Sequence, residues 1–313
     1  MAKREFVMLS RIYNEGKFRL DGSMVSEKLD GMRCIWIPQT RGLSSNDVPF
    51  MNREKDNREY VCSGLWSRLR KPIACPDWFA TALPINHCLD GELFAGRENF
   101  QQTMSAVKKL IPIDAEWSNI KYCLFDIPPY IEIGSMHKTM GVAVDQKWFA
   151  HRRFNENYNY LRNCEWPEWV EVVKQEQLPV QRTPATKRVQ ELMDEIVAGG
   201  GEGVMLRQPH SVWEPIRSND LVKLKPEDDA EGVVIGYTMG KGKLEGLVGA
   251  FNLDISERFG AGKELEMSGF TENERRITDG VPVYFPLGTK MTFKYSGLSD
   301  DGIPKIARYF RKA

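Results

Sequence analysis

The sequence predicts two domains, an α+β domain followed by a small closed barrel of short strands. Strand and helix signals both occur before Pro226, but without the regular strand–helix–strand alternation of a parallel α/β fold. After Pro226 the chain holds short strand-like runs separated by glycine-rich turns, which favours a barrel. Pro226 and the acidic EDDAE segment that follows form the best boundary. We therefore expect domains at 1–226 and 227–313.

The first domain begins with strand signals around a tight turn. Residues 24–28 and 33–37 read as strands, and Gly31 supplies the turn between them. Residues 38–60 are polar and rich in Asn, Asp, Arg and Ser, so we expect a long loop. Loops of this length are more often functional or mobile than inert.

Apolar periodicity predicts three helices. Residues 98–111 place Phe100, Met104, Val107 and Ile111 on one face. Residues 145–161 give a weaker helix signal. The strongest helix lies within 183–199, where Thr183 and Pro184 signal its start and Gly199 its end. Its expected buried face is formed by Val189, Leu192, Met193, Ile196 and Val197.

Strand-like runs follow this helix. They are VMLR (204–207), LVKLK (221–225), EGVVIGYTM (231–239), LVGAFNLDI (247–255) and KMTFKY (290–295). The last three fall in the predicted barrel domain.

The composition is that of a soluble globular protein, with 42% hydrophobic and 27% charged residues. No apolar run is long enough for a membrane helix, and the N-terminus does not resemble a signal peptide. We expect a cytoplasmic protein, or a viral protein in host cytoplasm, without membrane contact and without export. The six cysteines form no CxxC pair, so we expect reduced thiols.

The net charge is zero, so any phosphate-binding surface must be a local patch. Two basic stretches without an acid qualify. The first contains Arg68, Arg70 and Lys71, and the second contains Lys305, Arg308, Arg311 and Lys312.

The segment KLDGMR (28–33) places a lysine at a strand end, where the following Asp-Gly turn exposes it. A lysine amine is a nucleophile only when neutral, and nearby cations or desolvation favour that form. Lys223 and Lys225 are two apart on a predicted strand, so they share a face and could supply such cations or hold a phosphate. Glu92 and Glu202 stand at predicted strand starts and suit a hard metal such as Mg²⁺.

Each of these motifs alone is more often a surface feature, but their order along the chain is specific. The series KLDGMR, SRLRKPI, LDGELFAGR, YCLFDIP, EGVMLR and LVKLKP resembles the covalent nucleotidyltransferases: DNA ligases, RNA ligases and mRNA capping enzymes. Similarity outside these motifs, as in DGELFAGRENFQQTMSAV and AEGVVIGYTMGKGKLEGLVGAF, extends over nearly the whole chain. It resembles the minimal two-domain ATP-dependent DNA ligases of the Lig E type.

This resemblance implies a nucleotidyltransferase (adenylation) domain of antiparallel sheets with flanking helices, followed by an OB-fold barrel. It implies that Lys28 becomes covalently bound to AMP. The nucleotide contacts it implies come from Glu27, Lys28, Asp30, Arg33, Glu92, Phe125, Lys223 and Lys225, with Phe125 stacking on adenine. The implied DNA contacts come from Arg33, Arg68, Arg70, Lys71, Arg308 and Arg311. The implied metal ligands are Glu92 and Glu202.

The implied reaction seals a nick in duplex DNA in three phosphoryl-group transfers, with ATP and Mg²⁺, or Mn²⁺, as cofactors. We expect a monomer. The 38–60 loop is longer than the hairpin expected there, and it either orders on DNA or is an inert insertion. KIARYFRKA only loosely matches the C-terminal motif of larger ligases. Replication, repair and viral roles are not distinguished.

Two other functions compete with this one. An RNA ligase or a GTP-dependent capping enzyme shares the lysine motif, but the similarity outside the motifs favours a DNA ligase. A barrel-containing nucleic-acid-binding protein with a decayed transferase domain would not be expected to keep all the polar motif residues.

Overall fold

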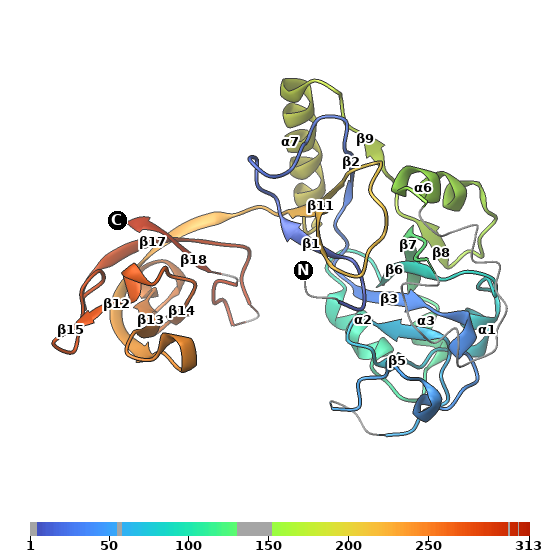
Figure 1. Ribbon diagram of the computed structural model, residues 1–313, viewed down its shortest axis with the longest axis horizontal. Helices are drawn as coiled ribbons and strands as arrows, with labels where there is room; N and C mark the ends of the chain where they lie inside the picture. The colour runs from blue at the N-terminus through green and yellow to red at the C-terminus, as the bar shows by residue number, and fades with distance from the viewer. Residues whose placement is uncertain (1–4, 55–57, 130–151, 300, 306) are drawn as a thin grey trace. The chain divides into compact units, whose positions relative to one another are not determined.

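The computed structural model describes residues 5–54, 58–129, 152–299, 301–305 and 307–313 (Figure 1). The chain forms two compact units, Met1–Leu224 and Lys225–Ala313. The second unit starts two residues before the start of the predicted second domain. Within the described ranges, no helix is both long and apolar enough to cross a bilayer.

The first unit contains two sheets. The five-stranded sheet has the order β1 (Leu9–Ile12), β11 (Arg217–Leu224), β10 (Val204–Arg207), β2 (Met24–Glu27), β9 (Glu176–Gln177). The six-stranded sheet has the order β5 (Pro72–Ile73), β4 (Leu65–Ser67), β3 (Met32–Trp36), β6 (Leu89–Phe94), β7 (Lys121–Asp126), β8 (Val170–Val172). Pairing is antiparallel except at the edges, where β1 lies parallel to β11 and β8 parallel to β7.

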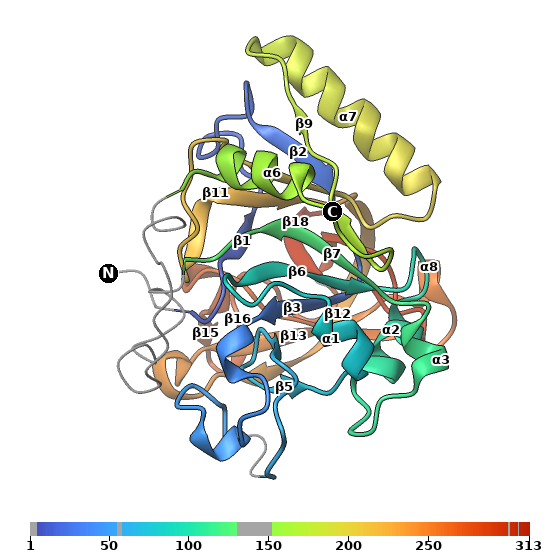
Figure 2. The same ribbon diagram turned by 90° about the vertical axis from the view of Figure 1, so that its right-hand side faces the viewer.

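Helices cover the outer faces of both sheets (Figure 2). The helices α1 (Asp77–Thr81), α2 (Phe100–Val107) and α3 (Asp114–Trp117) pack on the six-stranded sheet through Phe79, Val107 and Trp117. On the five-stranded sheet, α7 (Arg182–Ala198) packs through Val189 and Met193. Another helix, α6 (Phe154–Asn163), contacts β7.

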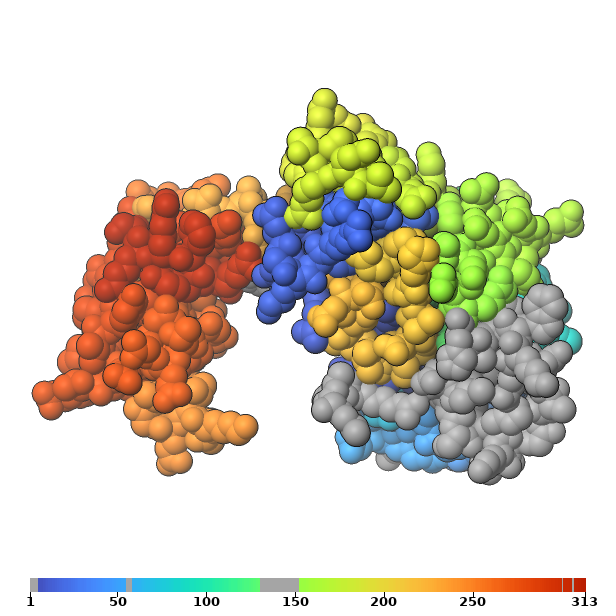
Figure 3. Space-filling model, turned by 45° about the horizontal axis from the view of Figure 1, so that its top comes forward, coloured from blue at the N-terminus to red at the C-terminus, as the bar shows by residue number. Residues whose placement is uncertain are grey.

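A separate apolar cluster lies between the sheets. It joins Ile35 of β3 to Leu221 of β11 and to Met8, which precedes β1. Figure 3 shows the N-terminal segment (blue) beside the segment that contains β11 (yellow), although the two are distant in sequence. The described N-terminal residues therefore help to hold the two sheets together.

The second unit is a curved antiparallel sheet around an aromatic core. Its strand order is β14 (Glu264–Met267), β13 (Val248–Asp254), β12 (Asp228–Met239), β17 (Lys290–Tyr295), β18 (Arg308–Lys312). A hairpin of β15 (Ile277–Thr278) and β16 (Val281–Pro282) and the short helix α8 (Ser256–Phe259) complete it. Phe251, Phe285 and Phe293 are fully buried in this core.

Most of the strong local signals are confirmed. The predicted strands at 24–28, 33–37, 204–207, 231–239, 247–255 and 290–295 correspond to β2, β3, β10, β12, β13 and β17. The strongest helix begins at Arg182, which places Pro184 in the first turn, and it ends before Gly199 as predicted. In the weaker prediction, 145–161, only the end matches, because α6 begins at Phe154 and residues 145–151 lie outside the described residues.

Other local predictions were confirmed only in part or were wrong. The helix predicted over 98–111 ends at Val107, and Ile111 is 82% exposed instead of buried. Glu92 lies inside β6, not at a strand start, and Glu202 precedes β10 by two residues. The strand β11 ends at Leu224, so Lys225 does not share a strand face with Lys223.

The described residues of the segment 38–60, 38–54 and 58–60, form a loop with two short 3₁₀ helices, η1 (Pro38–Thr40) and η2 (Ser45–Asp47). Its described residues include Val48 and Met51, which are buried in the cluster between the sheets. Two 3₁₀ helices in the second unit, η3 (Gly242–Leu244) and η4 (Asn273–Arg275), lie in connections.

Candidate active site

Lys28 lies where the chain crosses from one sheet of the first unit to the other. It directly follows β2 of the five-stranded sheet, and β3 of the six-stranded sheet begins four residues later. The Lys28 backbone N–H donates to the Gly203 carbonyl at 2.8 Å. Gly31 closes this crossover, since a Cβ there would lie 2.3 Å from the Leu93 carbonyl oxygen. The Asp-Gly turn is therefore pressed against β6, and a larger residue would displace it.

The Lys28 ammonium pairs with the Glu202 carboxylate. The register of β2 on β10, which places Val204 opposite Glu27, brings these two residues together. Both side chains are about one-fifth exposed (20% each). The structure thus joins a predicted nucleophile and a predicted metal ligand that are 174 residues apart.

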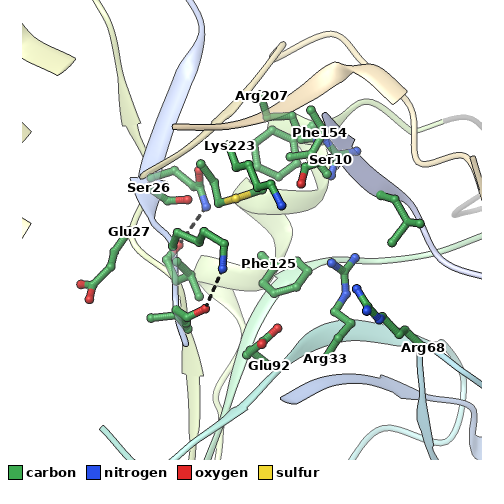
Figure 4. Close-up of a pocket in the computed structure, with 17 residues that line it drawn as sticks. Ser10, Ser26, Glu27, Arg33, Arg68, Glu92, Phe125, Phe154, Arg207 and Lys223 are labelled. Carbon is green, nitrogen blue, oxygen red and sulfur yellow. Dashed lines mark hydrogen bonds between the residues drawn. The ribbon is translucent and has the colours of Figure 1, made fainter. Parts of the chain in front are cut away.

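A cavity of about 220 Å³ opens beside Lys28 between the two sheets. Figure 4 shows Phe125 inside it, with Lys223, Arg207 and Phe154 on one side and Glu92, Arg33 and Arg68 on another. The predicted site residues that line it are Glu27, Lys28, Arg33, Arg68, Glu92, Phe125 and Lys223. Residues predicted from separate motifs are therefore gathered around one space.

Glu92 enters the cavity from the middle of β6. Burial raises the pKa of its carboxyl group to about 7, and the neighbouring Asp90 and Glu202 act in the same direction. Arg33 and Lys28 oppose this rise because they favour the charged form. The charges acting on Glu92 show that the two predicted metal carboxylates and the lysine share one electrostatic environment.

Arg33 is held by a buried acceptor. Its Nε and Nη2 each donate to Asp90 at 2.6 Å, and Trp213 Nε1 donates to the same carboxylate at 2.7 Å. The guanidinium also lies 4.4 Å from the ring centroid of Phe125. Arg33 Nη2 also donates to the Met8 carbonyl at 3.3 Å, so three hydrogen bonds hold the guanidinium beside the ring predicted to stack on adenine.

A second arginine–aromatic pair forms the opposite part of the cavity. Arg207 pairs with buried Asp126, donates to Ser211 Oγ at 3.0 Å, and lies 4.3 Å from the Phe154 ring centroid. Asn157 donates to the same aspartate at 2.8 Å. Sequence reasoning missed this network, although Asp126 follows Phe125 directly and Arg207 ends the EGVMLR segment.

Glu27 lines the cavity, but its carboxylate is directed elsewhere. Arg97 donates to its two oxygens at 2.8 and 2.9 Å, and Figure 4 shows the carboxylate pointing away from the other labelled residues. Neighbouring residues on a strand face opposite sides, so Glu27 and Lys28 diverge. The Glu27 carboxylate therefore faces Arg97, and the predicted nucleotide contact of this residue stays a prediction.

The remaining predicted residues, including Glu202, are not among those that line the cavity. Asp30 is exposed on the crossover turn, and Arg70 and Lys71 lie in the hairpin between β4 and β5. Lys225 belongs to the second unit. In that unit Arg308 pairs with Glu227 at 2.7 Å, and Arg311 lies 5.4 Å from the ring centroid of Phe310.

The carboxylates suit a metal held partly by a ligand. Among the described residues, no group of three or more His, Cys, Asp or Glu side chains is placed to hold a metal alone. Mg²⁺ is commonly bound through one or two carboxylates together with substrate phosphates. Glu92 and Glu202, which act on each other electrostatically near the Lys28 amine, fit that arrangement.

Comparison with known families matches both units. Residues 8–225 match the family described as "ATP dependent DNA ligase domain", and residues 239–312 match "DNA ligase OB-like domain". Together with the sheets described above, these matches confirm the predicted α+β fold with a C-terminal OB-like domain.

Individual relatives agree. A Haemophilus influenzae protein named DNA ligase is 27% identical over 307 residues, which is 98% of this chain and 91% of that protein. Human DNA ligase 4 is 26% identical over 182 residues, or 54% of this chain and 18% of the human protein. A solved structure from a structure–function analysis of Lig E DNA ligases has a TM-score of 0.68 and 26% identity, and 98% of each chain is covered.

Proposed function

The chain belongs to the ATP-dependent DNA ligase family, and we propose that it seals nicks in duplex DNA through an AMP group carried by Lys28. The observation that carries this proposal is the position of Lys28. Its ammonium borders a cavity that also contains an aromatic ring, a second lysine and a carboxylate, supplied by both sheets.

In the first step, Lys28 Nζ bonds to the α-phosphorus of ATP and the bond to pyrophosphate breaks. The ammonium must first lose a proton, because only the neutral amine has a lone pair. Glu202, its ion-pair partner, is in position to receive that proton. Lys223 lines the same space and offsets negative charge on the α-phosphate. Lys225 is proposed to act with it.

Two further transfers complete the reaction. An oxygen of the DNA 5′-phosphate attacks the phosphorus of the lysine-bound AMP, and the P–N bond breaks to restore the amine. The 3′-hydroxyl then attacks the DNA 5′-phosphorus and AMP leaves. Positioning and charge neutralisation supply most of the catalysis in such transfers.

A metal ion would be held by Glu92 and Glu202 together with phosphate oxygens. When bound, Mg²⁺ neutralises phosphate charge and favours pyrophosphate as a leaving group. The raised pKa of Glu92 fits this role, since a carboxylate costly to ionise alone is stabilised by an adjacent cation.

DNA would be bound through its phosphates. Arg68 and Arg70 are exposed beside the cavity, and Arg308 and Arg311 are exposed on β18. Guanidinium groups that contact phosphates hold a duplex in place without reading its sequence. We propose that a monomer binds both sides of the nick in this way, and light scattering of the complex would test its stoichiometry.

Labelling with ATP tests the nucleophile. Protein incubated with α-labelled ATP and Mg²⁺ should retain the label through an acid-labile P–N bond, and Lys28→Ala should abolish it. Lys187→Ala is the matched control, because that lysine is exposed on α7 and pairs with Glu191 at 3.7 Å, away from the cavity lining. Labelling of Lys28→Ala at the wild-type level would overturn the assignment.

The alternative is an RNA ligase or a GTP-dependent capping enzyme. Wild-type protein should label from ATP and not GTP, and it should seal nicked DNA faster than nicked RNA. Labelling from GTP alone would support the capping reaction instead.

A further inference from the structure

The segment SRLRKP forms a tight hairpin turn between β4 and β5. Ser67 N–H donates to the Lys71 carbonyl, and Arg70 N–H donates to the Ser67 carbonyl, both at 2.9 Å. Arg68, Leu69 and Arg70 at its tip are all exposed. Arg68 also lines the cavity that contains Lys28. This turn is therefore both a wall of the site and part of the outer surface.

Arg70 has an unfavourable backbone conformation. Its φ is +63°, in the left-handed region that favours glycine because a Cβ crowds the following carbonyl. Hairpins of this kind usually carry glycine at this position. An arginine that keeps a strained conformation suggests that its side chain has a function there.

Residues 48–52 of the preceding loop contact this turn. Asn52 N–H donates to the Arg70 carbonyl at 3.0 Å. The loop itself is anchored, since the Phe50 ring lies edge-on to Trp66 of β4 with centroids 4.6 Å apart. Neighbouring Val48 and Met51 are buried. A loop segment anchored in the core thus donates a hydrogen bond to the end of the turn from outside the hairpin.

We propose that residues 48–54 of this loop are a positioning element that presents Arg68 and Arg70 together to the phosphates of duplex DNA beside the nick. This inference rests on the proposed nick-sealing function. Duplex DNA presents a negative charge about every 1.7 Å along its axis, so two guanidiniums on one short turn can contact neighbouring phosphates. Arg70 is a DNA-contacting residue in this arrangement, and Asn52 is a positioning residue.

The first test replaces the strained residue with glycine. Arg70→Gly should unfold at the same or a higher temperature, because glycine adopts this conformation without strain. Its labelling by ATP should be unchanged, and its KM for nicked DNA should rise about fivefold, which corresponds to the loss of roughly 1 kcal/mol of charge interaction. Arg70→Lys should recover part of that affinity.

The dependence of DNA binding on salt separates a phosphate contact from a purely structural role. Each lost phosphate contact should lower the slope of log affinity against log salt by about 0.9. Asp279→Gly is the matched control, because Asp279 also has a positive φ, of +50°, but lies in the β15–β16 turn of the second unit. It should raise stability without changing KM or the salt slope.

The second test breaks the contact between loop and turn. Asn52→Pro removes the backbone N–H that donates to the Arg70 carbonyl, whereas Asn52→Ala keeps this N–H. The proline variant should show the raised KM and reduced slope of Arg70→Gly, and the alanine variant should behave as wild type. Should Asn52→Pro fail to fold, the Arg70 variants still decide the contact.

Wild-type KM and salt slope in Arg70→Gly would overturn the phosphate contact. Identical behaviour of folded Asn52→Pro and Asn52→Ala would overturn the positioning role of the loop. Failure of the wild-type protein to seal nicked DNA would instead refute the proposed function.

Discussion

The carboxyl group of Glu92 offers a quantitative test of the site. Its pKa is raised from an ordinary 4.5 to about 7, chiefly by burial, so the folded protein prefers the protonated form. Because the folded-state pKa lies above the unfolded one, the contribution of this carboxyl group to the free energy of unfolding is fully present below about pH 4.5. It is lost as the pH rises through about 7.

The expected size follows from this difference. One pKa unit corresponds to about 1.36 kcal/mol. The rise in the pKa of Glu92 from 4.5 to about 7 therefore corresponds to about 3 kcal/mol of stability lost by pH 8. Glu92→Gln has nearly the same shape and does not ionise. In the absence of metal, the variant and wild type should have the same free energy of unfolding near pH 4.5. At pH 8 the free energy of unfolding of the variant should be about 2–3 kcal/mol greater than that of wild type.

Urea unfolding at several pH values would measure this effect. Glu191→Gln, on the exposed face of α7, is the control. It should change the free energy of unfolding by at most about 0.5 kcal/mol at either pH. Adding Mg²⁺ and ATP should stabilise wild type more than the variant, and Glu92→Gln should lose labelling by ATP although it is the more stable protein. If Glu92→Gln changed the free energy of unfolding by the same amount at pH 5 and at pH 8, this reasoning would be refuted.

Three other substitutions probe the residues around the cavity. Asp90→Asn removes the buried charge that Arg33 and Trp213 share, and chemical unfolding should show a loss of about 3–5 kcal/mol; a loss below about 1 kcal/mol would contradict the buried ion pair. Arg97→Ala breaks a partly exposed pair with Glu27 and a hydrogen bond to the Gly199 carbonyl at 3.1 Å, so stability should fall by about 1 kcal/mol and labelling should stay within about twofold of wild type. A severe loss of labelling would show that this pair supports nucleotide binding. Phe125→Leu should raise KM for ATP about five- to tenfold, because stacking contributes about 1 kcal/mol, and should leave kcat nearly unchanged; an unaltered KM would remove Phe125 from the nucleotide site.

Local signals in the sequence predicted the parts of the fold that depend on local physics. The turn at Gly31 and the strands around it follow from residue type, and so does the end of α7 at Gly199. The gathering of Lys28, Glu92 and Lys223 around one cavity was expected from the order of motifs and is seen in the structure.

Predictions failed where tertiary contacts decide the outcome. The apolar period of 98–111 continues to Ile111, but the helix stops at Val107 and leaves that side chain in solvent. The parallel pairing of β1 with β11 joins distant segments, so no local pattern could indicate it. Asp90 and Asp126 stood inside recognised motifs, but their role as buried anchors needs three-dimensional partners.

Glu92, which lines the cavity, and Glu202, which pairs with Lys28 at its edge, belong to different sheets. Glu202 precedes β10 of one sheet, and Glu92 projects from β6 of the other. A ligand that binds both Glu92 and Glu202 therefore links the two sheets and restricts their motion relative to each other. Amide hydrogens of β6 and β10 should consequently exchange more slowly with solvent once nucleotide and metal are added. The same binding event that assembles the reactive site would then also reduce local opening of these strands.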